Sequence, residues 1–366
     1  MNAFTWVFLA ALAAATATQL WLSARQIRHV RAHRDMVPPM FAATIAAEAH
    51  QKAADYTVAK ARLSIGDLCV ETAMILALTL GGGIQMLGDL WARLFAPGTL
   101  AHGTALLLGF FLVQAAAGLP LSLYRVFGIE QRFGFNRMTW RLYLSDLAKQ
   151  TALAIVLGVP LVLALLWLMQ HMGSLWWLYA WLVLSAFTVV LQLLFPAVIL
   201  PLFNKFTPVA EGELAERVGA LLARCGFKAR GLYMMDGSKR SSHGNAFFAG
   251  FGATKRIVLF DTLVSRLEPP EVEAVLAHEL GHYKLHHIIK RIALSIATTL
   301  AGLWLLGQLM HEAWFYAGLG VAAPDMAAAL ALFMLVVPPF TFFLHPLTSH
   351  FSRRRWSSST ATTPRP

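Results

Sequence analysis

Apolar residues gather in about seven stretches of the chain, each long enough for the roughly 20 residues that a helix needs to cross a bilayer. This pattern predicts a mainly α, polytopic membrane protein with about seven transmembrane helices. The stretches lie near residues 3–22, 68–88, 100–123, 150–172, 175–199, 290–310 and 326–346.

The only sizeable polar segment lies between the fifth and sixth apolar stretches. Its stretch "EGELAERVGALLARCGF" (211–227) predicts an amphipathic helix that stops at Gly226, because glycine commonly ends helices. The following "ARGLYMMDGS" predicts a strand that ends in an Asp-Gly turn. This segment therefore has the helix, strand and turn signals of a small α+β region that folds in water.

A hairpin and a second helix are predicted further along the same segment. "GNAFFAGFG" and "KRIVLFDTLV" predict two strands joined across Ala253 and Thr254. Pro269 and Pro270 then begin a helix, since proline is favoured in the first turn.

Composition agrees with a membrane protein. Of the 366 residues, 57% are hydrophobic and 13% are charged, and the mean hydropathy is +0.59. An ordinary soluble domain of this length is far more polar. The two cysteines, Cys69 and Cys225, are too few for a disulfide framework and lie in no CxxC or Cys/His cluster, so we expect both to be packing residues.

The net charge of +11 is distributed unevenly between the loops. Basic residues crowd the loops after the first and third apolar stretches, whereas the loops after the second, fourth and sixth carry little charge. By the positive-inside rule, this alternation predicts an external N-terminus and cytoplasmic segments at 23–65, 124–149, 200–289 and the C-terminus. The basic residues flank apolar segments and form no aromatic-interleaved patch, so we expect no nucleic-acid partner.

The first apolar segment has an alternative interpretation as a cleaved signal peptide, because "AAATATQ" offers small residues. Its leading "MNAFTW" has no positive charge, however, and the basic cluster follows the apolar run. A retained first transmembrane helix therefore fits the pattern better.

The strongest chemical signal is His278-Glu279-Leu280-Gly281-His282. Two histidines four apart lie on one helix face about 6 Å apart along the axis, so both imidazoles can converge on one zinc ion. Glu279 is then placed to act as general base on water. So short a pattern also arises by chance as an accidental helix with surface histidines, but the preceding strand pair favours a metalloprotease, in which an edge strand holds the substrate backbone.

Longer motifs carry a family resemblance. The chain resembles integral-membrane zinc metalloproteases of the CAAX prenyl protease type, the Ste24 family of the M48 peptidases, from the first span to about Arg354. The matching stretches are "FGFNRMTW" (133–140), "PLFNKFTPVAEGELAERV" (201–218), "GSKRSSHGNAFFAGFGATKRIVLFDTL" (237–263), "HELGHYKLHH" (278–287) and "PFTFFLHPLTSHFSRR" (339–354).

This resemblance implies an architecture and an activity. It implies seven helices that enclose a large chamber, with a zincin-like segment and one Zn²⁺ per chain at the cytoplasmic side. It also implies cleavage of peptide bonds near the C-terminus of prenylated CAAX substrates, or of membrane or misfolded proteins in bacteria that lack prenylation. The implied regions are a membrane region at 1–200, a metalloprotease core at 201–289, the sixth and seventh helices at 290–350, and a polar tail at 351–366.

Residue roles follow from matching positions. The resemblance implies that His278 and His282 bind zinc and that Glu279 activates water. The implied substrate-binding residues are Asn245, Ala246 and Phe247.

The third zinc ligand is absent from its expected place. In the resembled family an acidic run after the serine-arginine pair supplies a glutamate, but here "HFSRR" continues as "RWSSSTATTPRP", which contains no Asp or Glu. Downstream of His282 the only acids are Glu312 and Asp325, and the predicted topology puts both on the opposite side of the membrane.

Other histidines can be tested as substitutes by geometry. His286 lies about 12 Å along the helix from His278, whereas two nitrogens on one zinc are within about 4.2 Å of each other. His287 lies on a different face of that helix. His350, at the cytoplasmic end of the seventh span, stays open as a substitute, whereas we interpret His345 as a packing or pore-lining residue.

The composition after Arg354 predicts a disordered tail. A shifted reading frame or a truncated gene product is one hypothesis for this ending. It leaves a second functional hypothesis open, a catalytically impaired relative that acts as a peptide-binding membrane scaffold. A transporter with an ion path through Asp67 and Glu71 is a weaker alternative, since both sit near the predicted interface. The expected location is a bacterial inner membrane, with the ER membrane second.

Overall fold

The computed structural model describes residues 1–227, 231–250, 256–284, 287–344 and 346, and the side chains of 282–288 lie outside the described part. The chain forms two compact units. The first comprises Met1–Gly134, Ala154–Trp177 and Leu303–His345, and the second comprises the remaining segments. The boundaries between the units cut through three helices, α5 (Trp140–His171), α6 (Trp176–Leu194) and α11 (His287–Leu309).

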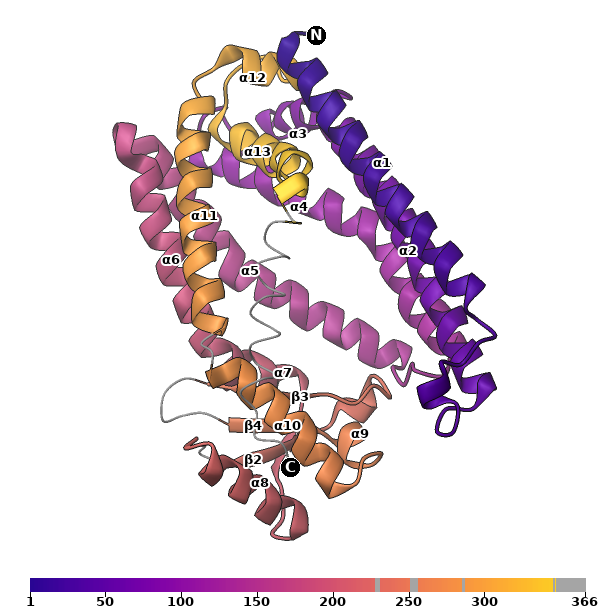
Figure 1. Ribbon diagram of the computed structural model, residues 1–366. Coiled ribbons are helices and arrows are strands. Elements are labelled where there is room, and N and C mark those ends of the chain that lie inside the picture. The colour runs from indigo at the N-terminus through magenta and orange to yellow at the C-terminus, as the bar shows by residue number, and fades with distance from the viewer. Residues whose placement is uncertain (228–230, 251–255, 285–286, 345, 347–366) are drawn as a thin grey trace. The chain divides into compact units, whose positions relative to one another are not determined.

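Long apolar helices dominate both units (Figure 1), as the sequence predicted. Six of those in the described part are long and apolar enough to cross a membrane, and a bent pair makes a seventh candidate. The predicted fold class, a mainly α polytopic membrane protein, is therefore confirmed. The chamber enclosed by the helices stays a prediction. The six helices are α1 (Ala3–Ala32), α4 (Leu100–Leu123), α5 (Trp140–His171), α6 (Trp176–Leu194), α11 (His287–Leu309) and α13 (Met326–Thr341).

The second predicted span, 68–88, is instead a bent pair of helices. α2 (Ala47–Leu78) and α3 (Gly83–Ala92) meet at 55°. The break follows from three consecutive glycines: Gly82 has a φ of +75°, and a Cβ on Gly81 would lie 2.6 Å from the Ala77 carbonyl oxygen. Side chains with a Cβ do not fit this bend, so the glycines make it possible.

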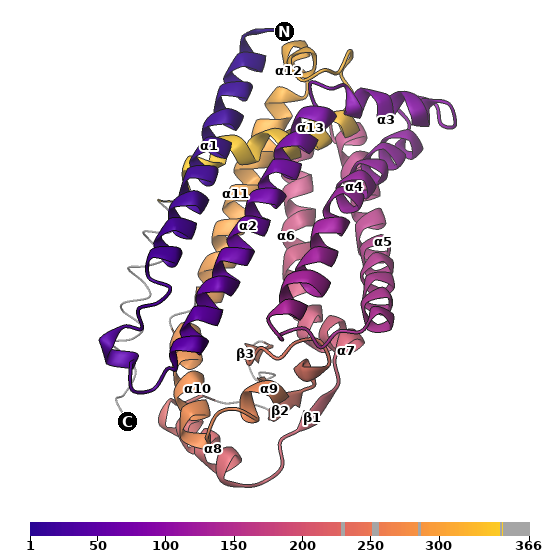
Figure 2. The same cartoon turned by 90° about the vertical axis from the view of Figure 1, so that its right-hand side faces the viewer.

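α2 also begins about 20 residues before the predicted span. The sequence analysis assigned 23–65 to a loop because the segment is charged, but α1 continues to Ala32 and α2 begins at Ala47. Buried Ala54, Val58 and Ala61 lie on one face of this early part of α2, and α2 packs against α1 (Figure 2). The helical period of small apolar residues thus outweighs the charges on the opposite face.

Asp67, considered above as part of an ion path, is in an ion pair. Its Oδ2 accepts a hydrogen bond from Nη2 of Arg125 at 2.9 Å. This pair gives Asp67 a structural partner within the first unit, which favours its interpretation as an interfacial residue over a transport role.

A four-stranded sheet lies in the second unit, in the order β1-β2-β4-β3. β3 and β4 are antiparallel, which confirms the predicted pairing, although Ala253 and Thr254 of the predicted turn lie outside the described residues. The sequence analysis did not predict β1, which pairs antiparallel with β2. It also did not predict that β2 and β4 pair in parallel. The strands are β1 (Phe206–Pro208), β2 (Leu232–Met235), β3 (Ala246–Ala249) and β4 (Arg256–Phe260).

Helices α8 (Glu213–Arg224) and α10 (Pro269–Lys284) cover one face of this sheet. One end of each helix lies where it was predicted: Gly226, with a φ of +64°, follows α8, and α10 begins at the Pro269-Pro270 pair. The shared core contains residues from both helices, two strands and the short helix α9 (Asp261–Val264), namely Val218, Leu221, Ala246, Ile257, Leu259, Leu263, Val272, Leu276 and Leu280.

Charged side chains also join α8 to α10. Glu273 of α10 accepts a hydrogen bond from Arg224 at 2.5 Å and lies 3.7 Å from Arg217. A hydrogen bond to Glu213 raises the pKa of Arg217, and the field of Glu273 adds to the effect. This helps to fix α10, the helix that carries the candidate site.

Short elements complete the described chain. They are the helices α7 (Leu200–Phe203) and α12 (Ala313–Gly318), the π-helical segments η2 (Tyr124–Glu130) and η4 (Phe195–Ile199), and the 3-10 turns η1 (Pro39–Phe41), η3 (Gly173–Leu175), η5 (Gly237–Lys239) and η7 (Phe342–Leu344).

Candidate metal centre

The proposed metal ligands lie on α10, on the side away from its core. The buried stripe of α10 contains Val272, Leu276 and Leu280. His278 is half-buried, and it lies about 200° around the helix from Leu276 because each residue turns the helix by about 100°. The backbone of His282 follows one turn later, about 40° from His278, while its side chain lies outside the described part.

Glu279 is also half-buried and follows His278 directly. Its place in the second half of a 16-residue helix fixes its backbone well inside the helical hydrogen-bond ladder. At the helix start, the carboxylate of Glu271 accepts a hydrogen bond from the Glu268 amide at 2.9 Å. With the core contacts, this cap holds the three motif residues on a rigid element, which a catalytic constellation needs.

Strand β3 lies beside this helix at the edge of the sheet (Figure 1). Ala246 is buried in the same core as Leu276 and Leu280. The Phe260 amide donates to the Asn245 carbonyl at 3.0 Å, so the antiparallel alternation turns the backbone groups of Ala246 away from β4, toward the outer edge. No other strand in the described part of the chain pairs with that edge.

Asn245 directly precedes β3 at this edge of the sheet. Its side chain is exposed, and its Oδ1 accepts a hydrogen bond from the Ala246 amide at 2.9 Å. Phe247 is half-buried, and its ring makes an edge-on contact with Phe260 at 6.2 Å. The three predicted substrate-binding residues are therefore consecutive at the start of an edge strand that packs on the motif helix.

A buried ion pair anchors the loop that leads into β3. Nε and Nη2 of Arg240 donate to the two carboxylate oxygens of Asp146 at 2.7 and 3.0 Å. Arg240 also donates to the Asn204 side chain at 2.9 Å and to the Phe203 carbonyl at 2.7 Å. Only 5% of Asp146 is exposed. Four charge-assisted hydrogen bonds therefore tie the approach to Asn245 to two other segments of the second unit.

Backbone hydrogen bonds reinforce this anchor. The Arg137 amide donates to the Arg240 carbonyl at 3.1 Å, and the Ser242 amide donates to the Phe135 carbonyl at 3.0 Å. The sequence analysis had noted both stretches involved, "FGFNRMTW" and "GSKRSSHGN", without predicting that they pair. Nothing in either stretch identifies its partner, because the contact joins residues about a hundred positions apart.

The described histidine side chain of the motif, His278, is of a type that binds zinc. Imidazole is a preferred zinc ligand, and His278 sits on an accessible helix face with a second histidine one turn away. Among the described residues, no three His, Cys, Asp or Glu side chains form a group able to hold a metal ion. The alternatives His286, His345 and His350 lie outside the described residues, as does the side chain of His287. Asp325 caps α13, where it accepts a hydrogen bond from the Ala328 amide.

Known families match most of the chain. The model of the CAAX prenyl protease N-terminal region, with five membrane helices, matches residues 26–205, and that of peptidase family M48 matches 208–361. The second match continues beyond Arg354, where we expected the resemblance to stop.

Full-length similarity decides the family. The chain is 32% identical to the CAAX prenyl protease 1 homolog of Homo sapiens over 95% of its own length and 83% of the relative's. The chain belongs to the Ste24-type M48 family. It is also similar to the crystal structure of S. mikatae Ste24p, with a TM-score of 0.88 and 27% identity, over 99% of this chain and 88% of that one. The Ste24-type fold and the multi-pass membrane character are thereby confirmed.

Coverage differs among the relatives of this Ste24-type chain. The CAAX prenyl protease 1 homolog of Dictyostelium discoideum is 39% identical over 246 residues, which are 66% of this chain and 58% of that protein. The rice and Arabidopsis homologs are matched over 47% and 45% of their lengths. The chain therefore spans about half the length of these curated relatives.

Proposed function

We propose that this protein is a membrane-embedded zinc metalloendopeptidase. The observation that carries the proposal is the packing of the His278-Glu279 helix on an open-edged strand that begins at Asn245. Family membership supports a peptidase, and the residue roles below are our assignments.

The substrate backbone would extend the sheet at β3. Backbone groups of Ala246 face the outer edge, so an extended peptide can add there as a further strand. When a peptide adds, the Ala246 amide gives up its hydrogen bond to Asn245 Oδ1 and donates to the substrate backbone instead. The Asn245 carboxamide is then free to bind a second backbone group of the substrate. The peptide is thereby held along the helix that carries Glu279.

Proton transfer is the task of Glu279. Its carboxylate takes a proton from the attacking water and returns it to the leaving amine, so that water adds to the carbonyl and the peptide bond breaks. We assign one Zn²⁺ to His278 and His282, and when bound it supplies Lewis-acid polarisation of the scissile carbonyl and of water. His350 stays the candidate for a third ligand.

We propose prenylated or membrane-associated proteins as substrates. The curated relatives bear the name CAAX prenyl protease 1, which supports cleavage near a prenylated C-terminus. The apolar membrane-spanning candidates of this chain suit a lipid-modified substrate. We place the protein in a bacterial inner membrane, with the ER membrane second and the catalytic segment in the cytoplasm.

A cleavage assay tests the function directly. Purified protein in detergent is incubated with a farnesylated CAAX peptide and with the same peptide lacking the farnesyl group. We expect cleavage that stops on chelation and returns on addition of zinc. Activity that persists without any metal would refute a metalloendopeptidase.

Replacement of Asn245 tests the substrate strand. We expect Asn245→Ala to raise KM about five-fold or more with little change in kcat, because a hydrogen bond to substrate is lost while the chemistry at α10 is untouched. Thr207→Ala is the matched control, since Thr207 is also exposed and lies on β1, the opposite edge of the same sheet. Equal effects of both substitutions would contradict the assignment of β3.

The alternative function is a peptide-binding scaffold that does not cut. It is favoured by the absence of Asp and Glu from residues 355–366, where the resemblance would place a ligand. Such a protein would bind the farnesylated peptide with unchanged affinity after chelation and would never cleave it. Binding and cleavage measured on one sample separate the two hypotheses.

A further inference from the structure

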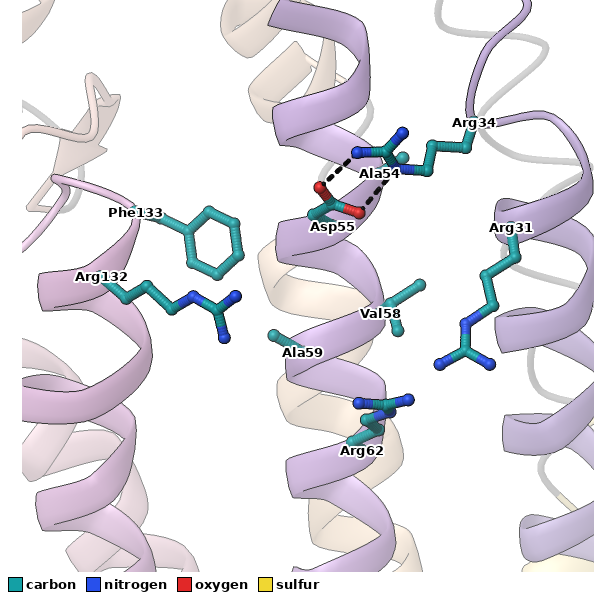
Figure 3. Close-up of a pocket in the computed structure, with 9 residues that line it drawn as sticks. All are labelled: Arg31, Arg34, Ala54, Asp55, Val58, Ala59, Arg62, Arg132 and Phe133. Carbon is teal, nitrogen blue, oxygen red and sulfur yellow. Dashed lines mark hydrogen bonds and ion pairs between the residues drawn. The ribbon is translucent and has the colours of Figure 1, made fainter. Parts of the chain in front are cut away.

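A cavity of about 420 Å³ lies in the first unit, outside the proposed catalytic machinery. Four arginines from separate segments line it: Arg31 from the end of α1, Arg34 just after it, Arg62 from α2, and Arg132 after η2. We call it the arginine pocket. Figure 3 shows Arg31 extending from α1 toward the side of α2 that carries Val58 and Arg62.

The pocket carries an excess of positive charge. Asp55 is its only lining carboxylate among the described residues, and both of its oxygens accept hydrogen bonds from Arg34 at 2.9 Å (Figure 3). Within the described part of the chain, the guanidinium groups of Arg31 and Arg62 form no hydrogen bond or ion pair with another side chain or with the backbone. Arg132 lies over the Phe133 ring at 5.6 Å. Like charges repel, so a cluster of this kind is stabilised when an anion enters.

A cluster of four arginines is typical of a phosphate-binding site. A guanidinium presents a planar fork of donors that matches phosphate oxygens in bidentate geometry, which an ammonium group does not offer. The Arg34–Asp55 pair fixes one side of the pocket, while buried Ala54 and Val58 give it an apolar wall. The exposed ends of Arg31 and Arg62 stay accessible to a ligand.

The position of the pocket indicates where the phosphate comes from. α1 is an apolar membrane-spanning candidate, and Arg31 lies in its last turn. The apolar stretch of α1 ends near residue 22, about 14 Å along the helix before Arg31. Side chains on a helix lean toward its N-terminus, so the Arg31 guanidinium reaches back toward the lipid headgroups. Basic pockets between transmembrane helices on the cytoplasmic side bind anionic headgroups.

We propose that the arginine pocket binds the phosphate headgroup of an anionic phospholipid. The phosphate lies between Arg31 and Arg62, with Arg132 as a third cation, while the acyl chains run along the apolar surface of α1. The bound lipid bridges α1, α2 and the end of η2, and stabilises their packing by mass action.

Native mass spectrometry of the detergent-purified full chain tests this proposal. The probes are phosphatidic acid and phosphatidylcholine with identical acyl chains. We expect the wild type to retain phosphatidic acid at least five-fold better, and Arg31→Ala/Arg62→Ala to lower its affinity by about 25-fold, or about five-fold per arginine. Arg62→Lys, which keeps the charge and loses the fork, should lie between the two.

Arg25→Ala/Arg28→Ala is the matched control. It removes the same number of positive charges, both from α1, at exposed residues outside the pocket, and should change the affinity by no more than about two-fold. Equal losses in the two double variants would overturn the proposal in favour of general surface charge. Equal retention of the two lipids would also overturn it.

A second arm distinguishes a lipid from a free anion. Inorganic phosphate is added to the wild type, and its affinity is compared with that of phosphatidic acid. The proposal requires phosphatidic acid to bind at least ten-fold more tightly, and equal affinities would overturn the lipid assignment. Thermal melting of each variant checks folding, and Arg62→Lys retains the test if the double variant melts early.

Discussion

Replacement of Glu279 by glutamine is expected to lower kcat for peptide cleavage by about 100- to 10,000-fold. Glutamine has nearly the same shape as glutamate but cannot take up a proton from water. Because Glu279 is not assigned as a metal ligand, the zinc content of the variant should equal that of the wild type. The measurements are single-turnover cleavage of a farnesylated CAAX peptide and metal analysis of the same preparation.

The matched control is Glu271→Gln on the same helix. Glu271 is exposed in the first turn of α10, and a glutamine oxygen can still accept the hydrogen bond from the Glu268 amide. We expect wild-type kcat from this variant. If Glu279→Gln cleaves as fast as the control, Glu279 is not the general base.

The second large effect concerns stability. Arg240→Ala leaves the carboxylate of Asp146 buried without its partner, because that side chain is only 7% exposed. Loss of one partner of a buried ion pair costs about 3–5 kcal/mol of folding stability. Peptide cleavage should fall as well, since the loop before Asn245 loses its anchor. Thermal unfolding in detergent and the half-life of activity at fixed temperature measure both consequences.

A neighbouring ion pair supplies the control for this prediction. Lys239 lies 2.5 Å from Asp236, but its side chain is 58% exposed, so Lys239→Ala should cost no more than about 1 kcal/mol. The double variant Asp146→Ala/Arg240→Ala should lose less stability than the sum of the single variants, because the two residues interact directly. Additive losses would contradict a coupled pair.

Local patterns predicted much of this fold. Apolar stretches of membrane-spanning length located the helices, and Gly226 and the Pro269-Pro270 pair located the boundaries of α8 and α10. The apolar stretches "GNAFFAGFG" and "KRIVLFDTLV" predicted β3 and β4 as partners. Each of these signals depends on neighbours in sequence, so single-sequence analysis can detect it.

Non-local features were not predictable in this way. β1 is only three residues long, and its pairing with β2 depends on the fold. The charged start of α2 is helical because small residues pack against α1, which local polarity does not show. The Arg240–Asp146 pair joins residues 94 positions apart, and neither residue type by itself indicates burial. The candidate site was found because both assigned histidine ligands and the assigned general base fall within five residues.

Local sequence patterns do not identify the third metal ligand. The motif on α10 supplies neighbouring imidazoles, whereas a further ligand must come from a distant segment, and the histidines considered for that role lie outside the described residues. Metal binding itself is therefore the most direct test of the account.

Zinc content of the purified chain, measured after dialysis against a weak chelator, is that test. We predict about one zinc per chain for the wild type and for Glu279→Gln, and none for His278→Ala or His282→Ala. A wild-type chain that retains no zinc, or histidine variants that retain as much as the wild type, would contradict the account.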